Sequence, residues 1–371
     1  MSFSIIINRR RFLQAASTAL AAGALPSIAS NKASAQTPGE LRVLVYGGDA
    51  GKAMIEAYVK PFEAETGIKM TPITDQGDRA SIEMMVAQNN VTVDVVTANQ
   101  GSSFELSQKG LFEPIDYSIY RNEDLDGLAD FAKQPFGVAN VVYAFVMVYN
   151  TEKFPAGKLR PTTWAEFWDV NSFPGVRSLV SGQYGSEGPW EEALLADGVN
   201  PKDIYPMDLD RVFKSLDRIK PDIRKWWGTG SEIQQMMHDK AVDLVNAYDG
   251  RAGTLIKQGA PLEINRNQAK ITWDYWQIVK GSPNAHAAQQ FVAFTARADR
   301  QAAFSQLMPF GPSNLNAFKV LPEDIGRSLA SHPDYLRSSV LIDSKWYAEK
   351  GSDGLTNTEK LVQRWNEWIL L

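Results

Sequence analysis

The chain has 371 residues, of which 44% are hydrophobic and 22% charged, a composition typical of a folded protein with two or three domains. It contains no cysteine, which excludes disulfides, thiolate metal sites and cysteine nucleophiles. The formal net charge is −5, whereas proteins that bind nucleic acids carry a basic excess. We therefore expect no nucleic-acid partner.

The first 35 residues have the composition of an export signal. Arginines at positions 9–11 precede an uncharged, alanine-rich stretch over residues 15–30, and Ala33–Ala35 forms an A-x-A cleavage site. The R-R-x-F-L pattern at residues 9–13 resembles the twin-arginine signal of bacteria, whose translocase exports folded proteins. The alternative, an N-terminal membrane anchor, is disfavoured by the alanine and serine content and by Pro26. We expect residues 1–35 to be removed and the protein to work in the periplasm.

The remainder of the chain is acidic. The first 35 residues hold three Arg, one Lys and no acid, so the rest carries 34 basic and 43 acidic groups, a net charge of −9. This balance favours a cationic partner. The longest apolar run, Val138–Tyr149, is shorter than the ~20 residues that a membrane-spanning helix needs, and its β-branched content favours buried strands.

Strands and helices are predicted to alternate over residues 41–97. Strand-like runs occupy residues 41–46, 68–74 and 93–97, and helical patterns occupy residues 52–66 and 79–89. This order predicts a parallel sheet, and open parallel sheets bind ligands at the carboxyl ends of their strands. One such loop begins at Tyr46 and another contains Asn99, so these two residues are candidate site residues.

A second α/β unit is predicted over residues 177–279. Strand-like runs occupy residues 177–181, 241–248, 261–264 and 271–279, and helical patterns occupy residues 190–197, 209–219, 232–238 and 251–258. The chain after residue 281 is predicted to be mostly helical. Since no Ser/Gly-rich linker separates the units, we expect two lobes joined by strands and not by a flexible tether.

The sequence has no recognisable motif for catalysis, a metal or a cofactor. His238, His286 and His332 lack metal-binding spacing, and the chain lacks G-x-S-x-G, G-x-x-x-x-G-K-[ST] and a complete G-x-G-x-x-G. A carboxylate pair for sugar hydrolysis stays open among 43 acidic residues, although no pattern singles out a pair. We expect no catalytic residue, no metal and no cofactor.

Aromatic residues flank charged residues in three segments near predicted strand ends: Trp226–Gly228, Tyr248–Arg251 and Trp273–Trp276. An ammonium over the face of Trp or Tyr gains roughly 0.5–2 kcal/mol, and a carboxylate fixes its position. The segments therefore favour a ligand that carries an amine. The alternative is that these aromatics are ordinary core residues.

Five short segments, in their order and spacing along more than 300 residues, resemble those of a known family. They are Pro61–Ile68, Gly110–Asp116, Tyr149–Pro155, Ala193–Val199 and Gly311–Asn314. With them, nearly the whole chain after the export signal resembles the periplasmic solute-binding proteins of the spermidine/putrescine-type ABC importers. The resemblance implies binding of a small solute and an inner-membrane ABC permease as partner; we also expect a monomer.

The resemblance also implies an α/β architecture, the two-lobed periplasmic-binding-protein fold of type II. In this fold each lobe is a mostly parallel sheet flanked by helices, and the ligand lies between lobes that close about a hinge. Two strands that cross between the lobes are expected near residues 146–151 and 272–279. Residues 36–148 and 275–371 then form lobe one, and residues 149–274 form lobe two.

Individual positions gain roles from the same resemblance. The family's amine-binding carboxylate falls on Asp274, and its aromatic ligand contacts fall on Tyr46, Tyr248 and Phe310. The chain departs from the family at Arg251, where some putrescine binders carry an acid; a guanidinium there repels an ammonium and attracts a carboxylate. The predicted ligand-binding residues are Tyr46, Asn99, Tyr184, Glu187, Trp227, Tyr248, Arg251, Asp274 and Phe310.

The loop over residues 182–188 also departs from the family pattern, because polyamine binders place acids there and this chain keeps only Glu187. An ω-amino acid such as γ-aminobutyrate needs one acidic and one basic end, which Asp274 and Arg251 would supply. A polyamine such as putrescine or spermidine needs acids at both ends and is the competing ligand. The alternative function is that of an exported enzyme on the same scaffold, acting on a small amine or sugar.

Overall fold

The computed structural model describes residues 39–371, so the predicted signal peptide lies outside the described residues. Strands and helices alternate through most of this range, and the segment after the last long strand is mainly helical. Both observations confirm the predicted α/β class. Between residues 39 and 371, no helix combines the length and the hydropathy that crossing a membrane requires.

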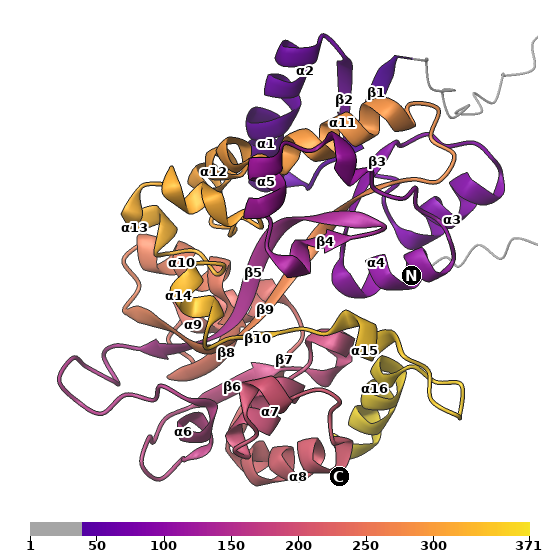
Figure 1. Ribbon diagram of the computed structural model, residues 1–371. Coiled ribbons are helices and arrows are strands. Elements are labelled where there is room, and N and C mark those ends of the chain that lie inside the picture. Colours follow the sequence, from indigo (N-terminus) through magenta and orange to yellow (C-terminus); the bar gives the residue numbers. More distant parts are fainter. Residues whose placement is uncertain (1–38) are drawn as a thin grey trace, which may run out of the picture. The chain divides into compact units, whose positions relative to one another are not determined.

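Ten strands of the described chain form one sheet (Figure 1). Its main path has the order β2-β1-β3-β9-β5-β8-β6-β7, with β10 paired to β9 and β4 paired to β5. The strands are β1 (Glu40–Leu44), β2 (Lys69–Ile73), β3 (Val95–Asn99), β4 (Lys133–Gln134), β5 (Gly137–Asn150), β6 (Arg177–Val180), β7 (Ile223–Trp227), β8 (Leu244–Tyr248), β9 (Leu262–Ile278) and β10 (Val340–Leu341).

Helices occupy most connections between the strands. Several begin at a side chain that accepts a hydrogen bond from the first turn, as Asn99 does for α4, Asp208 for α8 and Thr229 for α9. The α-helices are α1 (Gly48–Met54), α2 (Lys60–Thr66), α3 (Arg79–Ala87), α4 (Gln100–Gln108), α5 (Asn122–Gly127), α6 (Trp164–Trp168), α7 (Trp190–Ala196), α8 (Leu209–Ile219), α9 (Gly230–His238), α10 (Asp249–Lys257), α11 (Ala285–Thr295), α12 (Ala298–Leu307), α13 (Glu323–Gly326), α14 (Pro333–Leu336), α15 (Ser344–Ala348) and α16 (Asn357–Trp368).

Two long antiparallel strands, β5 and β9, hold the sheet together. On one side β9 pairs with β3, which continues into the parallel strands β1 and β2. On the other side β5 pairs with β8, which continues into the parallel strands β6 and β7. Figure 1 shows β5 and β9 side by side between these two groups. The two predicted parallel units are therefore present, and they are parts of one continuous hydrogen-bonded sheet.

Three elements differ from the sequence-based expectation. The strands predicted over residues 261–264 and 271–279 are one strand, β9, in which Gln268 adopts a positive φ of 57°. The helix predicted over residues 52–66 extends from Gly48 to Thr66 and contains one π-helical segment, Ile55–Val59. Strand β7 was not predicted. The helices predicted over residues 190–197, 209–219, 232–238 and 251–258 are present as α7, α8, α9 and α10.

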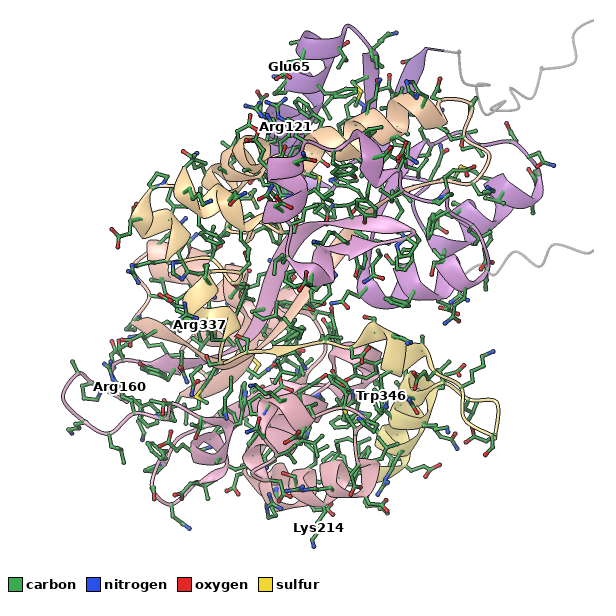
Figure 2. The ribbon with its side chains drawn as sticks, in the orientation of Figure 1. Glu65, Arg121, Arg160, Lys214, Arg337 and Trp346 are labelled. Atoms are coloured by element: carbon green, nitrogen blue, oxygen red, sulfur yellow. The ribbon has the colours of Figure 1, made fainter. Side chains whose placement is uncertain are left out.

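The C-terminal segment packs with the middle of the chain. Trp365 contacts Trp190 of α7, and Trp368 contacts Phe213 of α8, with ring centroids 5.8 and 6.0 Å apart. Trp346 of α15, labelled in Figure 2, belongs to the same buried cluster. The prediction placed residues 275–371 in lobe one; in the structure, buried residues between 340 and 368 cluster with α7 and α8 of the predicted lobe two, and Ser344 of α15 also donates to Gln100 of α4 at 2.6 Å.

Candidate functional site

The carboxylate of Asp274 accepts hydrogen bonds from two tyrosines. Tyr46, which follows β1, donates from its hydroxyl to Oδ2 of Asp274 at 2.6 Å, and Tyr143 of β5 donates to Oδ1 at 3.3 Å. The sheet sets this geometry, because Asp274 lies opposite Asn99 of β3 and Val141 of β5. Burial raises the pKa of Asp274, and the two hydroxyls oppose that rise because they stabilise the charged form.

A second carboxylate, Glu187, shares one of these tyrosines. Tyr143 lies 3.2 Å from Oε1 of Glu187, and the Tyr248 hydroxyl donates to Oε2 at 3.2 Å. Burial, followed by the negative charge of Asp274, raises the pKa of Glu187 to about 7, although Lys270 and the two hydroxyls act against it. Both carboxylates are therefore harder to ionise than in water, and a bound cation would stabilise their charged forms.

Glu187 lies in the Gly182–Gly188 loop, in which glycine is required at several positions, two of them Gly182 and Gly185. A β-carbon at Gly182 would lie 2.3 Å from Trp365 and 2.5 Å from Trp190, so a side chain there would overlap two buried indoles. Gly185 has a φ of 62°, which L-residues with side chains seldom adopt. These glycines let the chain turn sharply and bring Glu187 to the tyrosines.

Two cavities meet at this cluster. One has a volume of about 700 Å³ and the other about 520 Å³. Four residues line both: Tyr143, Tyr184, Tyr248 and Asp274. Tyr46, Arg251 and Phe310 line the larger cavity only, and Asn99 and Glu187 line the smaller one only. Eight of the nine predicted residues thus line one or both of these adjoining cavities.

Aromatic rings form much of the wall. Phe310 lies near Tyr46 and Tyr143, with centroids 6.5 and 6.3 Å away, and Tyr143 lies 6.1 Å from Tyr248. These rings line the same cavities as the carboxylates, so an ammonium bound there could also gain cation–π attraction.

Arg251 lies in the first turn of α10 and lines the larger cavity. Its Nη1 donates to Oε1 of Gln234 at 2.8 Å, and no carboxylate of residues 39–371 pairs with it. The neighbouring acid, Asp249, instead pairs with Arg266 at 3.1 Å. A β-carbon at Gly230 would lie 3.4 Å from Nε of Arg251, so glycine leaves room for the guanidinium. The guanidinium can therefore meet an anionic group in the cavity.

Trp227 is the one predicted residue that lines neither cavity. It is fully buried behind the wall, where its ring contacts Tyr184 at 5.4 Å and Tyr248 at 5.7 Å, and its Nε1 donates to the Asn246 carbonyl. Its position differs from the expectation because Trp227 ends the unpredicted strand β7 and faces the core. It supports two tyrosines from behind.

Sequence reasoning missed Tyr143, which contacts both carboxylates. The residue lies inside the apolar run Val138–Tyr149, where an aromatic is most simply explained as core. The signal that could have found it is the alternation of side chains along β5 together with the pairing of β5 and β9. Tyr143 lies opposite Thr272, two residues before Asp274. The register of that pairing is not encoded locally.

The side chains of the site are suited to binding an ammonium and a carboxylate. Among the described residues, no group of three or more histidine or acidic side chains is arranged to hold a metal ion. The carboxylates of Asp274 and Glu187 offer a negative end and Arg251 a positive one.

Comparisons with known proteins agree with this geometry. A family model described as "Bacterial extracellular solute-binding protein" matches residues 57–327. The chain is 32% identical over 336 residues to a γ-aminobutyric acid-binding protein of Pseudomonas aeruginosa, covering 88% of this chain and 90% of that one. It is 21% identical to a spermidine/putrescine-binding periplasmic protein of Salmonella typhimurium, covering 79% and 85%. The predicted family resemblance is confirmed.

A solved structure is similar over almost its full length. It is an ABC transporter substrate-binding protein from Bradyrhizobium japonicum, with a TM-score of 0.78 and 29% identity. The match covers 89% of this chain and 99% of that chain. The predicted fold class is thus confirmed by a structure as well as by the strand order.

Proposed function

Because the chain belongs to the bacterial extracellular solute-binding proteins, we propose that it captures a small ω-amino acid, such as γ-aminobutyrate, for import by an inner-membrane ABC permease. One observation carries the ligand class: Asp274 and Arg251, of opposite charge, line the same cavity of about 700 Å³. The ammonium binds at Asp274 with Glu187 beside it, and the carboxylate binds the guanidinium of Arg251, which can hold it with two parallel hydrogen bonds.

A polyamine is the second candidate ligand. The observation that favours it is the second carboxylate, Glu187, which would strengthen binding of an ammonium. Against it stands Arg251, whose positive charge would meet the far ammonium of a diamine. The γ-aminobutyric acid-binding relative is also more similar to this chain than the spermidine/putrescine-binding one. An exported enzyme is not favoured by any feature of the cavity.

The binding site supports two lobes that close on the ligand. Tyr46 and Phe310 come from the part of the chain proposed as lobe one, and Tyr248 and Arg251 come from lobe two. We assign residues 36–148 and 275–339 to lobe one, and add residues 340–371 to lobe two because they pack into its core. A monomer is sufficient for this function, since all these residues belong to one chain.

The export route follows from residues 1–35. We propose that the twin-arginine translocase delivers the folded chain and that the signal peptide is then removed. Replacing Arg9→Lys together with Arg10→Lys should leave precursor in the cytoplasm. Cell fractionation measures this, with Arg337→Lys as a matched control. Unchanged export of the double variant would contradict the twin-arginine route.

Calorimetry with γ-aminobutyrate, putrescine and spermidine tests the ligand class. We expect the parent to prefer γ-aminobutyrate. Asp274→Asn should weaken binding of every amine by about thirtyfold or more, because removing one partner of a buried charged pair costs on the order of 2–5 kcal/mol. Arg251→Met should weaken γ-aminobutyrate alone and abolish the preference.

Surface charges supply the matched controls. Arg337 has an exposed side chain (Figure 2) and Asp130 is fully exposed, and neither lines the two cavities. Arg337→Met and Asp130→Asn should bind like the parent. A parent that prefers putrescine or spermidine would replace the amino-acid proposal by the polyamine one. Binding of none of the three would overturn both.

A further inference from the structure

A buried lysine lies directly beneath the Gly182–Gly188 loop. The Nζ of Lys270 donates to the carbonyl oxygens of Gly188 at 2.6 Å and of Glu187 at 3.3 Å. It also lies 3.0 Å from Oε2 of Glu192 and 3.3 Å from Oε2 of Glu191. The side chain of Lys270 is 1% exposed, and those of both glutamates are 0% exposed. Lys270 thus connects the loop to the first turn of α7.

Polar groups from other elements complete the cluster. Oε1 of Glu191 accepts from the hydroxyls of Tyr205 at 2.5 Å and Tyr347 of α15 at 2.7 Å. Oε1 of Glu192 accepts from Nδ2 of Asn246 at 2.8 Å. Every carboxylate oxygen of the pair therefore has a partner, and one ammonium faces two acids. Such a network is costly to bury and loses much if one member is removed.

The strand that carries Lys270 also carries the ligand site. Lys270, Thr272 and Asp274 lie at alternate positions of β9, so their side chains point to the same face. The ammonium of Lys270 also lies 4.8 Å from the ring centroid of Phe145 on β5. Lys270 therefore links the strand of Asp274 to the backbone of Glu187, the second carboxylate of the site.

We propose that Lys270 is a positioning residue for the ligand: it holds the backbone at Glu187 and Gly188, so that the Glu187 carboxylate stands beside Asp274 as a second acceptor for the ammonium. This consequence rests on the proposed function. In the absence of Lys270 the carbonyls of Glu187 and Gly188 would lose this donor and Glu187 would lose the positive charge that acts on it, whereas Trp190 Nε1 would still donate to the Gly185 carbonyl at 2.7 Å.

Electrostatics support the same role. The groups that face Glu187 are Asp274 and Lys270 from β9, Tyr143 from β5, Tyr248 from β8 and Tyr184 from its own loop. Of these, only Lys270 is a cation. Burial would lower the pKa of Lys270, but Glu192 and Glu191 outweigh it and the pKa is raised, so the ammonium keeps its charge. It therefore opposes the repulsion that Asp274 exerts on Glu187.

The variant that tests this must keep the net charge of the buried cluster unchanged. Lys270→Met/Glu192→Gln removes one positive and one negative group together and takes away the contacts with the loop. Glu192→Gln alone keeps Lys270 and its bonds to the two carbonyls, so it is the matched control. Circular dichroism and thermal melting establish that both variants fold before they are compared.

The first measurement needs no ligand. Carboxyl-detected NMR titration, with Glu187→Gln to assign the signal, gives the pKa of Glu187 in each folded variant. We expect the pKa to be higher by about 0.5 or more in Lys270→Met/Glu192→Gln than in Glu192→Gln, because the cation is gone. An equal or lower pKa would overturn the assignment. This result stands even if the protein binds none of the tested amines, which would overturn the proposed function alone.

The second measurement compares ligand affinity in proteins that contain Glu187 and in proteins that carry Glu187→Gln. Calorimetry with γ-aminobutyrate should show about tenfold weaker binding in Lys270→Met/Glu192→Gln than in Glu192→Gln when Glu187 is present. With Glu187→Gln in both, the difference should fall within about twofold. Equal losses in both backgrounds would mean that Lys270 acts through general destabilisation, and the positioning role would be rejected.

Discussion

The hydroxyl of Tyr143 has one proton and two carboxylate neighbours. Its oxygen lies 3.2 Å from Glu187 and 3.3 Å from Asp274, so it can donate to only one of them at a time. Tyr46 donates to Asp274 and Tyr248 donates to Glu187, so one tyrosine hydroxyl, that of Tyr143, is left for the two remaining carboxylate oxygens. An ammonium has three donors and would complete the set. The ammonium thereby takes the place of the proton that Glu187, with a pKa of about 7, can otherwise carry.

Ligand affinity should depend on pH through Glu187. The pKa of Glu187 is about 7 without ligand and falls when an ammonium binds, so binding below pH 7 must release a proton. Affinity for γ-aminobutyrate should therefore fall about tenfold between pH 8 and pH 6. Calorimetry at several pH values measures this.

The control for the pH dependence is Glu187→Gln, which should bind more weakly at pH 8 and show a nearly flat profile. The other groups near Glu187 are tyrosines, whose pKa values are raised by burial, together with Asp274 and Lys270. No histidine lines either cavity. A parent profile as flat as that of the variant would contradict the role of Glu187.

Much of the site could be predicted from single residues. Tyr46 and Asn99 were candidates because the ends of parallel strands gather on one edge of a sheet. Tyr248 and Asp274 lie in segments where aromatic residues flank charged ones, and they gained their roles, as Phe310 did, from the family resemblance. Tyr143 was missed because its role depends on the register between β5 and β9, and Trp227 lies behind the wall because β7 turns it inward. Both depend on strand pairing, which a single sequence does not specify.

At the scale of elements, the sequence pattern was most informative for helices. The boundaries predicted for α8 match, because Asp208 caps its start and its apolar residues recur with helical spacing. The interrupted strand β9 was harder, since residues 265–268 (N-R-N-Q) favour turns, and of these only Asn265 has a partner on β5, at the register shift between Phe145 and Met147. Strand β7 contains Arg224 and Lys225, both exposed. Such charged residues are common on edge strands but weaken the apolar pattern by which a strand is recognised in a sequence.

At the scale of the whole described chain, the ligand should draw the two lobes together. The ammonium site is on β9 and the carboxylate site on α10, and Tyr46 and Phe310 come from the other lobe. Small-angle scattering should show a smaller radius of gyration when γ-aminobutyrate saturates the parent. Under the same ligand concentration, Asp274→Asn should retain the value of the free protein. An unchanged radius in the saturated parent would contradict closure.

The continuous pairing of β5 and β9 predicts an elastic connection between the two proposed lobes. A pair of hydrogen-bonded strands resists twisting in a way that two single loops would not, and its bulges near Ala139 and Val141 and near Phe145 and Met147 are the points where it yields. If the proposed lobes close on the ligand, we expect part of the binding free energy to be stored as torsion in this ribbon. That stored torsion works against the ligand and favours its release, so altering the bulges should tune how quickly the solute leaves without changing any group that touches it.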